Sequence, residues 1–450
     1  MWTQSRDERI LRYATLQMNP ATRFLDDGFH WYVPNMTIAL DTGAKRLGLF
    51  AAAVVLSGIY LTFCTRVFLA QYDCTRHDLQ HLQAAIRLMP WDADYHLQLA
   101  RYLFQDGKNM RASEVEYEAA ARLDPNRART WLGLGEVRQV LGDAQGARDA
   151  FEQALDADPT TPKVMWRVGE FFLTQGETER ASNEFKSVVT SEPGSTPAML
   201  RLVSRTTDTG TIIHDALPAE PGAYFDFIDL LIEKRDTASA VKVWDALAEL
   251  GKPLEARRAY EYINYLIAQR EVGEARSAWH TLALLSGLSS YLSSEHNRIV
   301  NPGFELEILN NGFDWRYQNE RDVTLTLERM RDHSAQNALA VSFEGPGVSD
   351  AGILQLIPVQ SGTEYEFSAS YKNGVIDGAG GPRFDISDAY TGTTYFQSGD
   401  LRDASDWRRC TAQFTTGRET QLLALRIARV PAGSPIRGKL WVADFHLAQK

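Results

Sequence analysis

The chain has 450 residues, enough for about three domains. Hydrophobic residues make up 44% of it and charged residues 23%, as in ordinary folded proteins. The formal net charge of -11 provides no basic footprint and argues against nucleic acid as a partner. Three cysteines, Cys64, Cys74 and Cys410, are too few for a disulfide framework. Because no CxxC, HExxH, Walker-loop or GxSxG motif occurs, the sequence predicts a protein that is not an enzyme.

An apolar segment follows a tail of mixed composition. Residues 1–44 combine charges of both signs with scattered aromatic residues, so we predict a loosely structured N-terminal tail. The next segment, Leu47–Thr65, has 19 uncharged residues and matches the hydrocarbon thickness of a bilayer. We predict a transmembrane anchor over residues 45–70. A buried core helix and a cleaved signal peptide are the alternatives, but no A-x-A cleavage pattern lies near the end of the segment.

The charges beside the anchor predict its orientation. Lys45 and Arg46 precede it as an adjacent pair, and Arg66 and Arg76 follow it. The adjacent pair favours a cytoplasmic N-terminus, which places the bulk of the chain outside the cytoplasm. We therefore expect a single-pass membrane protein, and in a bacterium one of the inner membrane that faces the periplasm.

A period of 34 residues governs the region after the anchor. Each unit reads as two short helices with a glycine in the turn and a proline after the second helix. The repeated pairs are Gly135 and Gly169, Gly142 and Gly176, Ala147 and Ala181, Phe151 and Phe185, and Pro159 and Pro193. This pattern resembles the tetratricopeptide repeat. The resemblance implies an α-helical solenoid in which each hairpin buries its apolar face against its neighbours.

The repeats extend on both sides of these two units. Trp244 and Trp279 stand 35 residues apart where the repeat phenylalanine is expected. Between Gly194 and Pro221 the pattern frays, so we predict a distorted repeat there. The solenoid is predicted to occupy residues 71–295.

The resemblance also implies a concave groove, lined by the first helices of the hairpins, that binds peptide segments or helices of partner proteins. The clamp with which some members hold a C-terminal carboxylate is not evident, because glutamates occupy that helix face. Ordinary solvated helix positions are the alternative interpretation. The predicted groove residues are Arg129, Leu132, Glu136, Gln139, Lys163, Trp166, Glu170 and Leu173.

The composition changes near residue 296, where short apolar-alternating runs separated by turn residues begin. In one run Leu423, Leu425 and Ile427 fall on one face and Arg426 on the other. Residues 296–450 are therefore predicted to form an antiparallel β-sandwich or jelly roll. The expected fold is a multidomain α and β protein with a transmembrane helix, a solenoid and a sandwich.

This C-terminal region resembles the carbohydrate-binding-module jelly rolls of extracellular bacterial proteins. The residues that carry the resemblance include the opening Asn301-Pro302-Gly303-Phe304-Glu305, then Gly312-Phe313-Asp314-Trp315, and the closing Trp441-Val442-Ala443-Asp444-Phe445. The resemblance implies glycan binding, with exposed tyrosine rings as platforms and charged groups that bind hydroxyls. Trp315 and Trp407 are expected to serve packing instead. The predicted glycan-binding residues are Arg383, Asp385, Tyr390, Tyr395 and Arg426.

The same resemblance implies a structural calcium ion between Glu305 and Asp444, helped by backbone carbonyls. Where members of the family have an Asp-Asp pair, this chain has Ala443-Asp444, which removes one oxygen ligand. Calcium takes about six to eight oxygen ligands, so an empty site is the alternative. No other cofactor is predicted.

These elements predict a membrane-anchored extracytoplasmic scaffold that binds protein partners through its groove. Glycan binding by the sandwich, in envelope polysaccharide assembly or export, is a further expectation that rests on architecture alone. One alternative is a carbohydrate-active accessory or hydrolase with paired carboxylates, although no domain of catalytic size remains unassigned. The other is a sandwich that serves only as a structural or protein-docking module.

Overall fold

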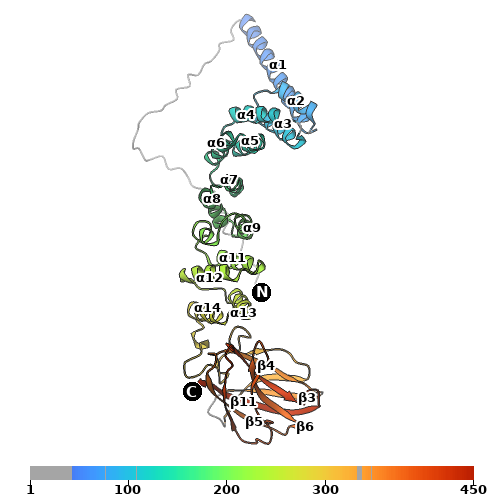
Figure 1. Ribbon diagram of the computed structural model, residues 1–450. Helices are drawn as coiled ribbons and strands as arrows, with labels where there is room; N and C mark the ends of the chain where they lie inside the picture. Colours follow the sequence, from blue (N-terminus) through green and yellow to red (C-terminus); the bar gives the residue numbers. More distant parts are fainter. Residues whose placement is uncertain (1–42, 77, 108, 332–336, 346) are drawn as a thin grey trace, which may run out of the picture.

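The computed structural model describes residues 43–450 apart from 77, 108, 332–336 and 346. A long helix leads into a column of helical hairpins, and a β-sandwich lies at the far end of the column (Figure 1). The predicted N-terminal tail lies outside the described residues except for its last two, which begin the first helix. The predicted fold class, a helical array followed by an antiparallel sandwich, is confirmed.

The first helix, α1 (Gly43–Cys74), combines two roles along its length. The segment Arg46–Cys74 is long and apolar enough to cross a membrane. The rest of the protein does not cover its most apolar stretch. It is therefore a candidate anchor, as predicted. Its last turns differ, because Ala70 and Cys74 are buried in a cluster formed with the next two helices. The helix thus crosses the predicted limit at residue 70 without a break and enters the solenoid core.

The hairpins that follow show why the periodic glycines are needed. A Cβ atom on Gly135 would lie 2.9 Å from the ring of Phe151, and one on Gly169 would lie 2.9 Å from the ring of Phe185. Both rings are buried, so the missing side chain is what lets the two helices of a hairpin approach. These helices are α2 (Leu79–Leu88), α3 (Ala93–Asp106), α4 (Met110–Leu123), α5 (Ala128–Leu141), α6 (Ala144–Ala157), α7 (Pro162–Thr174) and α8 (Thr178–Ser191).

The distorted repeat predicted between residues 194 and 221 is confirmed. Short helices and one π-helical turn replace a regular hairpin there: η1 (Pro193–Ser195), α9 (Thr196–Val203), α10 (Thr209–Thr211) and η2 (Ile212–Ala216). Regular hairpins then return, and Trp244 and Trp279 are both buried, as their spacing predicts. The helices of this part are α11 (Pro221–Glu233), α12 (Thr237–Glu249), α13 (Ala256–Ala268), α14 (Val272–Leu285) and η3 (Ser289–Tyr291).

The sandwich consists of two antiparallel sheets. Sheet A has the strand order β1-β4-β10-β7-β8, and sheet B has the order β2-β3-β11-β5-β9 with β6 paired to β11. Leu423, Leu425 and Ile427 point into the core between the sheets, as the alternation predicts, and Trp315 is buried with them. The strands are β1 (Arg316–Tyr317), β2 (Val323–Arg329), β3 (Asn337–Gly345), β4 (Asp350–Pro358), β5 (Glu364–Asn373), β6 (Asp377–Gly378), β7 (Gly381–Asp388), β8 (Thr394–Gln397), β9 (Arg408–Thr415), β10 (Leu422–Val430) and β11 (Ile436–Gln449).

The outer face of sheet A packs against the last hairpin of the solenoid. Leu356, Leu422 and Ala424 on this face belong to the same hydrophobic cluster as the core of α11–α14. The ring of Phe313 meets the ring of Trp279 edge-on, with 6.1 Å between the ring centroids. The boundary predicted near residue 296 falls in the irregular segment between η3 and β1, and the hydrophobic core continues across it.

Candidate functional site

A groove of about 930 Å³ crosses the first regular hairpins. Four of the predicted groove residues line it, namely Arg129, Leu132, Glu136 and Lys163. Arg101, Tyr117, Arg127 and Arg167, which the sequence interpretation missed, line it as well. The side chains come mainly from the first helices of three successive hairpins, α3, α5 and α7, as the repeat pattern implies.

The cations of the groove fall into two groups. Arg127 pairs with Asp94 and with Asp124, and Arg167 pairs with Glu136 and with Glu170. In contrast, Arg101, Arg129 and Lys163 are exposed and have no hydrogen-bond or ion-pair partner among the described residues. Their charges are therefore available to a ligand.

The two acidic residues of the lining are already engaged. Glu136 accepts the ion pair from Arg167, and Asp158 accepts a hydrogen bond of 3.0 Å from the backbone N–H of Thr161 at the start of α7. Hydrogen bonds from Thr161 hold the pKa of the Asp158 carboxyl below its usual value. The free charge that remains in the groove is positive.

The floor of the groove is apolar. Tyr117 is buried there, and burial raises its pKa to about 12. A Cβ atom on Gly133 would lie 2.3 Å from the Tyr117 ring. Glycine at this position therefore allows the Tyr117 ring to pack closely against α5.

Four predicted groove residues do not line this groove. Trp166 packs edge-on against Phe185 and donates a hydrogen bond of 2.8 Å to Glu170. Gln139 donates one of 3.3 Å to Thr174 in the next hairpin. Leu173 packs against the hydrophobic core. Gln139 therefore joins two neighbouring hairpins, whereas Trp166 and Glu170 are engaged within their own hairpin.

A signal for one missed residue was present in the sequence. Arg101 precedes Glu136 by 35 residues, the same step that separates Pro90 from Pro125. It therefore holds the groove position of the preceding hairpin. Arg167 follows Lys163 by one helical turn and shares its face.

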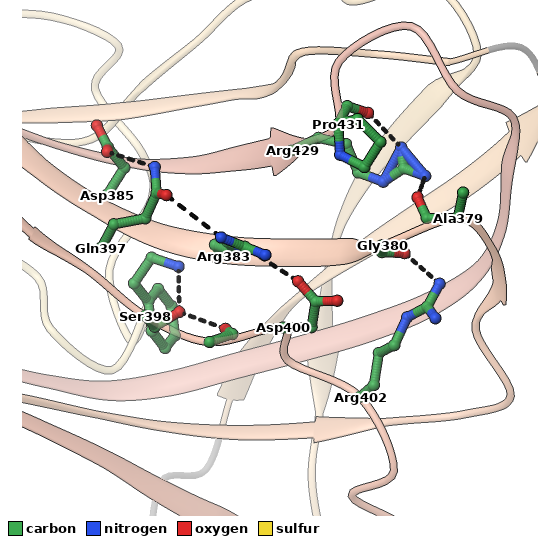
Figure 2. A network of polar contacts seen from close by, with 12 residues as sticks. Ala379, Gly380, Arg383, Asp385, Gln397, Ser398, Asp400, Arg402, Arg429 and Pro431 are labelled. Atoms are coloured by element: carbon green, nitrogen blue, oxygen red, sulfur yellow. Dashed lines mark hydrogen bonds and ion pairs between the residues drawn. The ribbon is translucent and has the colours of Figure 1, made fainter.

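The sandwich brings three of the predicted glycan-binding residues together on the outer face of sheet A. Gln397 links Arg383 to Asp385, with distances of 3.4 Å from Nη1 of Arg383 to Oε1 of Gln397 and 3.2 Å from Nε2 of Gln397 to Oδ1 of Asp385 (Figure 2). Arg383 also donates to Asp400 at 2.8 Å. Arg426 lies 3.9 Å from Asp385 across the strand pair. The result is a row of oriented donors and acceptors along β7, β8 and β10.

The expectation that Tyr390 and Tyr395 present exposed rings is wrong. The Tyr390 hydroxyl donates a hydrogen bond of 2.7 Å to the carbonyl of Ile267 on α13, so the solenoid covers this residue. The Tyr395 hydroxyl accepts one of 2.9 Å from the backbone N–H of Gly417, and its ring stacks on Phe414. Both rings are occupied in packing, and neither forms a platform.

Glu305 and Asp444 line one hollow of about 750 Å³, which lies between the connecting segment and strand β11 of sheet B. Asp444 has a φ of 54° and sits in a bulge of β11, and Phe445 beside it donates a backbone hydrogen bond to Pro302 in the opening segment. No group of three or more His, Cys, Asp or Glu side chains able to hold a metal ion occurs among the described residues. The two carboxylates supply only some of the oxygen ligands that calcium takes, so the others would have to be carbonyls or water.

Sequence profiles of the tetratricopeptide repeat family match residues 97–162 and 140–205. This part of the chain, which contains the groove, therefore consists of tetratricopeptide repeats. Over 100 residues the chain is 29% identical to the mouse protein O-mannosyl-transferase TMTC1. That match covers 20% of this chain and 10% of the relative, so the chain spans only a small part of it.

Solved structures resemble parts of the molecule. A CBM4 structure is 15% identical with a TM-score of 0.27, over 34% of this chain and 99% of that one. YrrB, a TPR protein with an unusual peptide-binding site, is 17% identical with a TM-score of 0.23, over 46% of this chain and 92% of that one. Likenesses of this size say nothing about the ligands of this protein.

Proposed function

We propose that the protein is a membrane-anchored scaffold that holds an acidic, extended segment of a partner protein in the groove between α3, α5 and α7. The observation that carries this proposal is the set of three free cations, Arg101, Arg129 and Lys163, above an apolar floor. Tetratricopeptide repeats support protein binding in general, and the groove supports the choice of an acidic partner.

Charge complementarity supports this choice of partner. The chain as a whole carries a net charge of -11, yet the free charges of the groove are positive. An acidic segment would therefore be repelled by the net charge of the protein and attracted to the free cations of this groove. Charge-assisted hydrogen bonds from arginine to carboxylates are about twice as strong as neutral ones, and three successive hairpins would each supply one cation.

The test uses the full chain in detergent and two synthetic peptides. One peptide is rich in aspartate and glutamate, and the other carries asparagine and glutamine at the same positions. We expect binding of the acidic peptide alone, weakened by salt. The double variant Arg129→Gln/Lys163→Gln should bind it about tenfold or more weakly. The matched control Arg257→Gln changes an exposed arginine on α13, 75% accessible and paired with Glu261, and should bind normally. Equal binding of both peptides would refute the proposal.

The anchor assignment is part of the same proposal. With α1 in the membrane and Lys45 and Arg46 on the cytoplasmic side, the solenoid and the sandwich lie on the opposite side. Reporter fusions after Arg76 and at Lys450 should then be active only outside the cytoplasm. Activity inside the cytoplasm at either position would reverse the orientation.

A second candidate function is glycan binding by the sandwich, and the row of Arg383, Gln397, Asp385 and Arg426 favours it. Because no tyrosine platform accompanies the row, binding would depend on hydrogen bonds to hydroxyls and would be weak, roughly micromolar to millimolar. A role in envelope polysaccharide assembly or export, and a calcium ion between Glu305 and Asp444, belong to this candidate. Titration with envelope polysaccharide fragments, with and without a calcium chelator, tests it; the variant Gln397→Ala should abolish binding.

A further inference from the structure

Two adjoining hollows lie where α14 meets the sandwich. One has a volume of about 470 Å³ and the other about 370 Å³, and both are lined by Gly273, Arg276 and Pro358. In Figure 1 the last hairpin, α13 and α14, lies directly beside the sheets. The solenoid and the sandwich therefore contribute the walls together, and neither part forms this site alone.

The charge of this junction site is one-sided. Arg276 and His280 of α14 and Arg298 of the connecting segment line the larger hollow. Among the described residues that line either hollow there is no aspartate or glutamate. In a chain with 58 acidic and 47 basic residues, a junction with two arginines and no acid is a local reversal of charge.

The two arginines are also free. No side-chain hydrogen bond or ion pair joins Arg276 or Arg298 to another described residue, and Nε of Arg298 is buried without a hydrogen-bond partner. A neighbouring arginine shows the usual arrangement: Arg258 on α13 pairs with Asp226 and Asp229. A buried guanidinium nitrogen without a partner is costly, so an acceptor supplied by a ligand would stabilise it.

The rest of the lining is polar and uncharged around an apolar wall. Gln360 and Gln421 at the sandwich side offer amides, which both donate and accept hydrogen bonds. The Ser361 hydroxyl beside them already donates to the carbonyl of Thr420. Trp279 and Phe313 form the apolar wall of the larger hollow. The indole N–H of Trp279 already donates to the carbonyl of Tyr291, so the wall presents ring surface only.

We propose that this junction binds an acidic saccharide, a compound that carries an oxyanion on a hydroxyl-rich ring. Arg276 and Arg298 bind the carboxylate or phosphate oxygens, because a guanidinium matches the geometry of an oxyanion. Gln360 and Gln421 bind the hydroxyls. This site lies outside the repeat groove and apart from the row on β7, β8 and β10, so it goes beyond the proposed function.

Calorimetric titration of the full chain in detergent tests the site with three probes. Tri-galacturonate carries carboxylates, its methyl ester carries none, and glucose 6-phosphate carries a phosphate. We expect binding of at least one acidic probe and no binding of the ester, with the acidic probe that binds identifying the oxyanion. Arg276→Gln/Arg298→Gln should weaken binding about ten- to a hundredfold, whereas Arg276→Lys/Arg298→Lys should weaken it less.

The groove variant Arg129→Gln/Lys163→Gln is the matched control. It should bind the acidic probe as the wild type does, which separates this site from the peptide groove. Neither arginine of the junction makes a side-chain hydrogen bond or ion pair with another described residue, so the variants should fold normally. Failure of both acidic probes to bind, equal binding of the ester, or unchanged binding by the double glutamine variant would overturn the proposal.

Discussion

The two ends of the solenoid are held together differently. At the end that begins with α1, the hairpins up to α5 share small, separate clusters, one around Leu82 and Tyr95 and another around Tyr117 and Leu134. At the other end, one hydrophobic cluster continues from α5 through α14 into the sandwich. Repeats that contact only their neighbours add their stabilities locally, whereas a shared core makes its parts unfold together.

The two proposed sites relate differently to these clusters. The repeat groove lies where the clusters meet, because Tyr117 belongs to a separate cluster whereas Leu132 and Val164 belong to the continuous one. It requires only that three neighbouring hairpins keep their spacing. The junction site needs α14 and the sandwich in a fixed relation, which the continuous core provides. The comparison predicts that mutations at the two ends will differ in how far their effects spread.

The largest effect is expected for Trp279→Ala. This side chain is 4% exposed, contacts Phe313 of the sandwich, and bonds to Tyr291. Its removal should leave a cavity in the shared core and lower the free energy of unfolding by about 4–5 kcal/mol. Hydrogen exchange should rise in α13, α14 and sheet A together. Trp91→Ala is the control, because Trp91 is 55% exposed.

If exchange rises in α14 while the strands of sheet A keep their protection, the sandwich folds independently. The shared core would then be a contact between two domains, and the predicted boundary near residue 296 would mark a true division.

A smaller and local effect is expected for Leu134→Ala. Leu134 is buried in the cluster with Tyr117, which does not reach the sandwich. The cavity should cost about 3 kcal/mol. Faster exchange should be confined to α3–α6, and the sandwich should keep its protection. Val140→Ala, on the exposed side of the same helix, should change neither. Loss of protection in the sandwich would show that cooperativity spans the whole array.

Local packing explains which features the sequence predicts well. The repeat glycines and phenylalanines touch each other within one hairpin, as Gly135 and Phe151 do, so their spacing alone specifies the contact. The same holds for the strands, where Leu423 and Arg426 are assigned to opposite faces by alternation. These contacts lie between residues that are close in the chain or that follow the period of one element.

Long-range contacts explain what the sequence interpretation missed. The Thr and Gly residues beside Tyr390 indicate an exposed turn, but they do not show that Ile267 of α13, which lies 123 residues earlier in the chain, covers it. Hydropathy likewise marks α1 as apolar without showing that Ala70 is buried by the next helices. The junction site is of the same kind, because Arg276 and Gln421 come together only when the solenoid meets the sandwich.

The last prediction concerns a carboxyl group buried in the junction. Asp314 is fully buried; Oδ2 accepts a hydrogen bond of 2.7 Å from the backbone N–H of Leu309, and Oδ1 has no hydrogen-bond partner. Burial raises its pKa to about 6. The folded protein therefore binds a proton between about pH 4 and pH 6 that the unfolded chain releases.

Because the folded state holds the extra proton, the contribution of Asp314 to stability is complete at about pH 4 and is lost as the pH rises through about 6. The loss should amount to about 2–3 kcal/mol. Asp314→Asn cannot titrate, so the difference in free energy of unfolding between the wild type and this variant should fall by that amount between about pH 4 and pH 7. Urea denaturation across this range measures it. A difference that stays constant with pH would mean that Asp314 titrates normally, and that the junction admits water to this carboxyl.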